Sequence, residues 1–387
     1  MIAPWRTVVL LFLIAIDVVQ PASASSLQRL GFEDLKGWTS DDHAAALQSF
    51  RRSCREILDE GLAFQRPTKF GGARSDWIEL CNGALAAAPA RSYFESYFTP
   101  FKVVDDARPE GLFTGYYEPE AEGARTPDAK FTVPIYRRPA TLVSFSQEQK
   151  DKSGLDYGHL VDGKPAAYFS RKDIEQGALK GQGLELVWLK DWADAFFIHV
   201  QGSGRVRFAD GSTMRLSYAA KSGRRYTSIG GLLVERGLLT REQMSMQAIR
   251  AWMSRNPQET RALMWENQSF IFFREAQLQD PSLGALSAQH VQLTSGRSLA
   301  VDRGIWAFGT PVWLETNVPS ATDGVAQPFN QLLIAQDTGT AITGHARGDV
   351  FWGFGEAAGN IAGRMKSPGS MIVLLPKTVA ARLGLIP

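Results

Sequence analysis

The arrangement of strand-like segments along the chain constrains its fold more than any other feature. Residues 25–100 read as helical, whereas from Gly111 to about Gly237 the chain is rich in Tyr, Phe, Val and Gly, with few long helical windows. Helical patterns then return, and the last hundred or so residues are again rich in strands. Short strands at this density are typical of a small barrel or sandwich. The order predicts a mainly β protein with helices (α+β), in which the middle barrel is inserted into a domain built from both ends.

The expected elements follow from apolar periodicity and from turn residues. The expected strands are Phe131–Tyr136, Glu185–Leu189, Ala195–Val200, Arg205–Phe208, Ser298–Val301, Thr310–Glu315, Gln331–Ala335 and Ser370–Leu375. The expected helices are one capped by Ser40, one capped by Ser75, Ala90–Phe98, one after the capping box Thr240–Gln243, and one started by Asn256-Pro257. The expected units are residues 25–112 with 237–387, and an inserted barrel over residues 113–236. A space between two such domains would suit an extended ligand.

The first 24 residues have the pattern of an export signal. Met1–Arg6 carries one charge, which is positive, Val8–Ile16 is a nearly unbroken apolar run, and Ala22-Ser23-Ala24 supplies small residues for cleavage. The run is short for a bilayer of roughly 30 Å, which requires about 20 residues, and Asp17 interrupts its end. We therefore favour cleavage after Ala24 over a retained anchor. Because no cysteine follows the run, we expect no lipid-bearing N-terminus, and we expect a soluble, periplasmic mature chain.

Charge and cysteine content limit the classes of function. The formal net charge is +2, from 42 basic and 40 acidic residues, so a basic stripe for nucleic acid is not supported. Cys54 and Cys81 both lie on the apolar faces of expected helices and point toward the same small core. In an oxidising compartment two such cysteines usually pair. Two buried free thiols are the alternative, and neither cysteine has the setting of a nucleophile.

Three aspartates lie at the ends of expected strands. They are Asp302, Asp337 and Asp349, the last two within the stretch 335–355, which is rich in glycine turns. A charged group in such a place must be paired or exposed, although each aspartate could equally be a turn-forming residue. The five histidines are scattered, so a metal shared by His345 and Asp349 is a weak alternative and no metal or cofactor is expected. Gln201–Gly204 is not the nucleophile elbow of a serine hydrolase.

Aromatic and polar side chains lie beside glycines in three further stretches. These stretches are Phe113–Pro119, Val133–Pro139, and His199–Gly204 together with Tyr218–Arg224. Flat rings next to fixed donors and acceptors suit the binding of sugar rings. A half-buried barrel edge would show the same residues, and the pattern does not decide between the two.

At these residues the chain resembles the MltA family of membrane-bound lytic murein transglycosylases. The matching pieces are Phe113–Glu118, Val133–Pro139, Ala195–Gly204, Ser217–Gly230, Asn267–Phe273, Arg297–Pro311 and Gln336–Gly363. The stretch from Asp337 to Gly355 also resembles the family's three-aspartate (3D) module. The resemblance implies a double-psi β-barrel with an inserted second barrel and a glycan groove between them. It implies cleavage of the β-1,4 bond between N-acetylmuramic acid and N-acetylglucosamine, with formation of a 1,6-anhydro end.

The resemblance also implies roles for individual residues. Asp349 matches the family's catalytic acid and Asp337 its second aspartate. The residues expected to contact the glycan are Thr114, Tyr116, Tyr117, Gln201, Ser203, Lys221 and Asp302. Many family members are outer-membrane lipoproteins, and this chain lacks the lipid-bearing cysteine. We expect a monomer that binds peptidoglycan strands, and we leave open a peripheral association with the outer membrane and membership of a wall-synthesis complex.

One carboxylate can suffice for this reaction, because the C6 hydroxyl of muramic acid is a tethered nucleophile. Asp349 would first protonate the leaving oxygen and then accept the hydroxyl proton. A protonated start requires a raised pKa, from burial against Phe351 or Trp352 or from the charge of Asp337. Arg347 would oppose this, so we expect it to point away. The competing hypotheses are a glycan-binding module without activity and a hydrolase that uses Asp337 and Asp349 with water.

Overall fold

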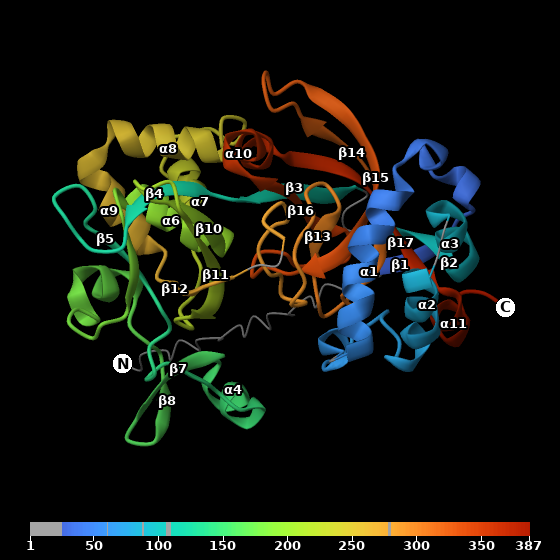
Figure 1. Cartoon of the computed structure of the whole chain (residues 1–387), viewed down its shortest axis with the longest axis horizontal. Coiled ribbons are helices and arrows are strands. Elements are labelled where there is room, and N and C mark those ends of the chain that lie inside the picture. Colours follow the sequence, from blue (N-terminus) through green and yellow to red (C-terminus); the bar gives the residue numbers. More distant parts are fainter. Residues whose placement is uncertain (1–24, 60, 87–88, 106–109, 278–279) are drawn as a thin grey trace, which may run out of the picture.

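The computed structural model describes residues 25–59, 61–86, 89–105, 110–277 and 280–387. The expected export signal, residues 1–24, lies outside this part of the chain. Figure 1 shows two bodies side by side, with strand β3 (Gly111–Glu118) extending between them. No helix in the described ranges is both long enough and apolar enough to cross a bilayer.

The first body is a closed barrel whose strands come from both sides of the second body. Its ring follows the order β3, β16, β13, β15, β14 and β17, and the pairing of β17 with β3 closes it. Strands β1 and β2 extend the same sheet beyond the ring. The bounds are β1 (Ser25–Arg29), β2 (Phe98–Asp105), β13 (Ser298–Val301), β14 (Pro311–Pro319), β15 (Ala326–Asp337), β16 (Arg347–Phe354) and β17 (Lys366–Pro376), with helices α10 (Gly355–Arg364) and α11 (Lys377–Arg382).

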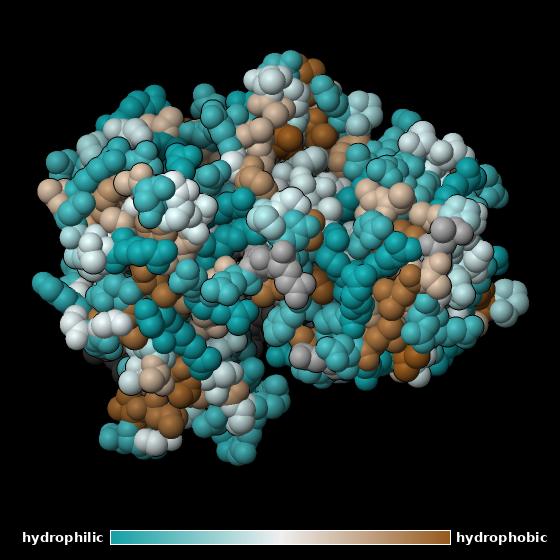
Figure 2. Space-filling view, viewed as in Figure 1, coloured by the Kyte–Doolittle hydropathy of each residue, from teal (hydrophilic) through white to brown (hydrophobic). Residues whose placement is uncertain are grey.

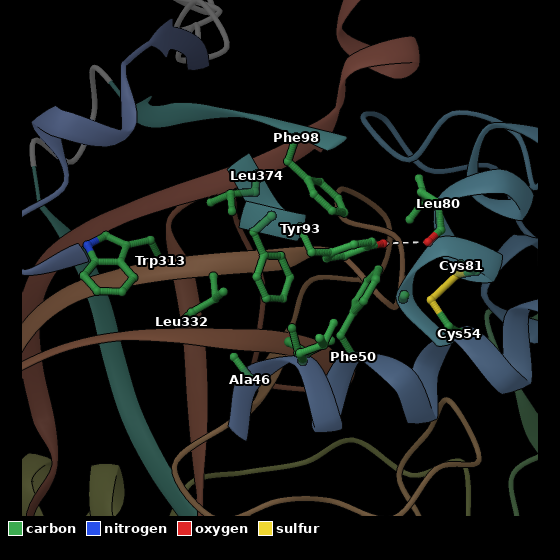
Figure 3. Packing of buried hydrophobic residues seen from close by; sticks show 14 of the residues in the cluster. Ala46, Phe50, Cys54, Leu80, Cys81, Tyr93, Phe98, Trp313, Leu332 and Leu374 are labelled. Carbon is green, nitrogen blue, oxygen red and sulfur yellow. Dashed lines mark hydrogen bonds between the residues drawn. A yellow bond between two sulfur atoms is a disulfide. The ribbon is translucent and has the colours of Figure 1, made fainter. Parts of the chain in front are cut away.

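Three N-terminal helices cover one outer face of this barrel. They are α1 (His43–Asp59), α2 (Ser75–Ala86) and α3 (Ala90–Tyr97). Figure 3 shows Phe50 and Tyr93 from the helices packed toward Leu332 and Leu374 of the barrel strands, which gives the helices a shared core with the sheet. Helix α1 begins after Asp42, whose carboxylate accepts the Ala45 backbone N–H at 3.0 Å, rather than at the expected Ser40 cap.

The two cysteines join inside this helical core. Cys54 of α1 and Cys81 of α2 form a disulfide, and both are fully buried (Figure 3). The helical spacing of their apolar neighbours predicts that both thiols point toward the same small core, and in the structure they pair there.

The second body is a six-stranded sheet in the order β12, β11, β10, β4, β9, β5. A bridge between Arg137 and Phe273 brings its two edges together, so it also curls into a barrel. Its strands are β4 (Glu120–Ala124), β5 (Val133–Tyr136), β9 (Glu185–Leu189), β10 (Ser203–Arg207), β11 (Thr213–Lys221) and β12 (Ile271–Glu275), and its helices are α5 (Arg171–Asp173), α6 (Trp192–Gln201), α7 (Ile229–Glu235), α8 (Met246–Arg255) and α9 (Pro257–Glu266). The expected fold class, two barrels with helices, is confirmed.

The sheet pairings show where the chain passes from one barrel to the other. Strand β12 pairs with β11, so the second sheet continues beyond residue 236, the expected end of the insertion. Strand β3 pairs with β16 and β17, so residues up to Glu118 belong to the first barrel.

A small third sheet projects from the second body. It contains β6 (Val143–Ser144), β7 (Tyr157–Val161) and β8 (Lys164–Ala166), beside helix α4 (Gln147–Ser153). Figure 2 shows an apolar patch on this projection, where Leu160 and Val161 are exposed.

One expected strand, Ala195–Val200, is wrong: these residues lie in helix α6. Residues 195–199 are all buried, so neither a period of two nor a period of 3.6 can be recognised in them. The residues on either side of this run show that it is a helix. Asp191 accepts the Asp194 backbone N–H at 2.9 Å, and Gly202 ends the helix with a φ of 74°. Gly202 is therefore the C-cap of helix α6.

The helix after Thr240 also begins later than expected. Thr240 and Gln243 do exchange hydrogen bonds, at 3.2 and 3.3 Å. They close a turn, however, and helix α8 begins at Met246 after Ser245, whose hydroxyl accepts the Ala248 N–H. Helix α9 starts at Pro257 as expected.

Candidate active site

Asp349 lies on the outer surface of the first barrel. Its strand, β16, runs between β13 and β3, and the next residue, Val350, is fully buried in the barrel core. Because side chains alternate along a strand, Asp349 points out of the barrel. Its partner on the neighbouring strand β3 is Thr114. The Thr114 hydroxyl donates a hydrogen bond of 2.6 Å to Asp349 Oδ1.

Arg347 belongs to the same group, contrary to expectation. Its Nη2 donates to Thr114 Oγ1 at 2.8 Å, so it reaches Asp349 through the Thr114 hydroxyl rather than through a direct ion pair. The expectation that Arg347 points away is wrong, because residues two apart on one strand share a face.

The pKa of Asp349 is raised from its ordinary value of 3.8 to about 6. Burial is the largest cause, because it disfavours the charged form. The hydrogen bond from Thr114 and the charge of Arg347 lower the pKa, while the charge of Asp337 raises it. The residue as a whole is nevertheless partly exposed.

Asp337 ends strand β15 close to Asp349, and both of its oxygens are occupied. The Tyr116 hydroxyl donates to Oδ2 at 2.9 Å and the Ala288 backbone N–H donates to Oδ1 at 3.0 Å. Burial raises the pKa of Asp337, and these hydrogen bonds partly oppose the rise. Tyr116 shares a face of β3 with Thr114 and packs on Phe351, with ring centroids 5.2 Å apart.

Gly115, between these two residues, lets β3 lie close against its neighbours. A Cβ at this position would lie 2.7 Å from Cδ1 of Trp352 and 2.8 Å from Cα of Ala362. Any other residue would push β3 away from β16 and α10, and would separate Thr114 from Asp349.

Asp302, the third strand-end aspartate, has a different environment. Its Oδ1 accepts the Gly304 backbone N–H at 3.0 Å, and its Oδ2 accepts that of Gly344 at 2.9 Å. It therefore ties the turn after β13 to the loop that precedes Asp349. This is the behaviour of a turn-forming aspartate.

The remaining expected contact residues have other neighbours. Tyr117 points to the opposite side of β3, where its ring lies against Gly359 of α10, and its backbone N–H donates to Gln201 Oε1 at 3.1 Å. Ser203 is buried in β10, opposite Ser217. Lys221, at the end of β11, forms an ion pair of 3.5 Å with Asp156.

The weak metal hypothesis finds no support in this geometry. The imidazole Nε2 of His345 lies 3.1 Å from Nζ of Lys69, a cation. Over the described ranges, no group of three or more His, Cys, Asp or Glu side chains could hold a metal ion.

Known proteins share this architecture and these segments. The model of the MltA specific insert domain matches residues 112–274, and that of the 3D domain matches residues 297–375. A crystal structure of a membrane-bound lytic murein transglycosylase from Agrobacterium tumefaciens is 36% identical, with a TM-score of 0.82 over 92% of this chain and 99% of that chain. The chain belongs to the MltA family.

Two further relatives of the MltA family are informative. Membrane-bound lytic murein transglycosylase A of Vibrio cholerae is 37% identical over 264 residues, which are 67% of this chain and 63% of the relative. The match therefore spans less than two thirds of that relative's length. A structure of Escherichia coli MltA with bound chitohexaose is 27% identical, with a TM-score of 0.65 over 93% of each chain.

Proposed function

We propose that the chain is a lytic transglycosylase of peptidoglycan. It would cleave the β-1,4 bond between N-acetylmuramic acid and N-acetylglucosamine and leave a 1,6-anhydro end. The observation that carries the proposal is a single carboxyl group, that of the partly exposed residue Asp349, whose pKa is raised to about 6 by burial. Membership of the MltA family and the names of its relatives support this substrate class.

The proposed reaction needs no water. Protonated Asp349 gives its proton to the glycosidic oxygen, and the bond from that oxygen to C1 of muramic acid breaks. The C6 hydroxyl of the same sugar then attacks C1, and the Asp349 carboxylate accepts the hydroxyl proton. The enzyme ends as it began, and the two products together contain all the atoms of the substrate. The tethered hydroxyl makes the second step effectively unimolecular.

Asp337 is proposed to act on Asp349 and on the charge that develops in the sugar. Its negative charge disfavours ionisation of Asp349 and so helps to keep the proton in place. The same charge would stabilise a positively charged transition state at C1.

The arrangement favours transglycosylation over hydrolysis by two carboxylates. A hydrolase that uses both groups requires the second carboxylate to activate water or to attack the sugar. Both oxygens of Asp337 already accept hydrogen bonds, from the Tyr116 hydroxyl and the Ala288 backbone N–H. A carboxylate held in this way is a poor candidate for a mobile base.

We also propose that the protein works in the periplasm. The N-terminal pattern is that of an export signal, and a disulfide such as Cys54–Cys81 is typical of oxidising compartments.

The direct test is a digest of purified peptidoglycan, with the products identified by mass spectrometry. Wild-type protein should release anhydro ends, and Asp349→Asn should not. Asp323→Asn, which changes an exposed aspartate in the turn between β14 and β15, is the matched control and should keep its rate. Reducing ends would indicate hydrolysis instead, and an inactive wild type that still binds cell-wall sacculi would indicate a binding module. An Asp349→Asn variant with the wild-type rate would refute the assignment of the acid.

A further inference from the structure

Two arginines of the first barrel lie together near the second barrel. Arg303 follows Asp302 at the end of β13, and Arg66 lies in the segment between α1 and α2. Backbone hydrogen bonds hold the two segments side by side, from Lys69 N–H to the Gly304 carbonyl at 3.2 Å and from Phe70 N–H to the Ile305 carbonyl at 3.1 Å. The two guanidinium groups are close enough for the charge of Arg66 to lower the pKa of Arg303, after burial, the larger cause.

Tyr218 of the second barrel, together with Asp156 and Tyr157 beside the projecting third sheet, faces Arg303. Asp156, Tyr157 and Tyr218 each act electrostatically on the Arg303 guanidinium, so this side chain lies where the two barrels approach each other. Tyr218 is 42% exposed and is hydrogen-bonded to Tyr157, which leaves an accessible aromatic surface opposite the arginine.

The arginines are also close to the candidate acid. Ala300 is the direct neighbour of Asp349 in the sheet, and Arg303 is only three residues further along the chain. At about 3.3 Å for each extended residue, Arg303 lies at most about 10 Å from Ala300, and Asp349 lies a further distance of about 5 Å away on the next strand. A substituent on a sugar bound at Asp349 could therefore reach Arg303.

Several positive charges lie around one carboxylate at this place, Asp156. Asp156 already forms ion pairs with Lys150 at 3.6 Å and with Lys221 at 3.5 Å. One carboxylate thus faces two lysines in addition to Arg66 and Arg303. Such a group of positive charges attracts an anion.

We propose that Arg303, together with Arg66, binds a carboxylate of the peptides that peptidoglycan carries on its muramic acid. The inference rests on the proposed function and adds the part of the substrate that these residues recognise, the peptides on the glycan strands. The N-acetylated sugars of the strand are neutral, whereas the peptides carry carboxylates. The planar guanidinium group binds a carboxylate through two parallel hydrogen bonds, and a second guanidinium beside it strengthens the attraction.

The alternative is that Arg303 merely holds the two barrels together through Asp156. The two roles differ in their dependence on the charge of the substrate. A contact between the barrels would affect all strands equally, whereas a site for carboxylates distinguishes charged peptides from neutral ones.

The test compares kcat/KM on two preparations of the same peptide-bearing strands, one native and one with its peptide carboxylates converted to amides. Wild type should prefer the native strands by about tenfold, as expected for one partly exposed charge-assisted contact. Arg303→Gln should abolish most of this preference, and Arg66→Gln, on a separate segment, should reduce it. Arg207→Gln, an exposed arginine of β10, is the matched control and should retain the preference.

Two results would overturn the inference. Wild type could cleave both preparations equally, or Arg303→Gln could slow both by the same factor while the preference persists. Thermal unfolding of each variant checks that the variant is folded. If Arg303→Gln does not fold, the preference of Arg66→Gln for native strands tests the inference instead. Absence of anhydro products from either preparation would instead count against the proposed function.

Discussion

Replacing Thr114 by valine should make Asp349 a weaker acid while leaving it in place. The Thr114 hydroxyl donates a hydrogen bond of 2.6 Å to Asp349 Oδ1, and such a donor stabilises the carboxylate more than the protonated acid. Valine has a similar shape but no hydroxyl. The pKa of Asp349, now about 6, should therefore rise.

The size of the shift follows from the strength of that hydrogen bond. A hydrogen bond to a charged group contributes about 1.5–3 kcal/mol, and about 1.4 kcal/mol corresponds to one pH unit. Because Asp349 is partly exposed, we expect the lower end of this range, a rise of about one unit. The reaction starts from protonated Asp349, so activity falls as pH rises through its pKa. The alkaline limb of kcat/KM should therefore lie near pH 6 in the wild type and about one unit higher in the variant.

The assay measures kcat/KM for the formation of anhydro products across the whole pH range in which the protein is folded. Thr213→Val, at an exposed position on β11, serves as the control and should leave the profile unchanged. An alkaline limb that stays in place, or that moves to lower pH, would show that the hydrogen bond from Thr114 does not set the pKa of the catalytic acid.

Three further predictions concern stability and the second aspartate. Asp349→Asn should increase the free energy of unfolding in urea at neutral pH by about 3 kcal/mol, because the pKa of Asp349 rises from 3.8 to about 6 on folding; the gain should vanish below pH 3.8. Replacing Cys54 and Cys81, which are 27 residues apart, by serine should lower that free energy by about 3.5 kcal/mol, and reduced wild type should match the variant. Tyr116→Phe should raise the pKa of Asp337 and reduce its charge, so the alkaline limb of kcat/KM should move to lower pH, opposite to the effect of the valine variant.

Local patterns were sufficient for several elements. The strands Glu185–Leu189 and Ser298–Val301 have the expected bounds, and Cys54 and Cys81 pair in the core toward which both were expected to point. Local patterns failed for residues 195–199. These residues are all buried, so the apolar run shows neither a helical nor a strand period. There the capping residues on either side were the better guide.

The candidate acids and the alternation of helical and strand-rich parts can be recognised in the amino-acid sequence, because turn residues and apolar spacing are local properties. The family resemblance added a role for Asp349. The surroundings of that residue, in contrast, arise from the folded chain. Thr114 is 235 positions away and meets Asp349 through the pairing of β3 with β16, and its hydroxyl also accepts a hydrogen bond from Arg347. The pKa of Asp349 depends on this burial and on these neighbours, and neither exists until distant segments pair.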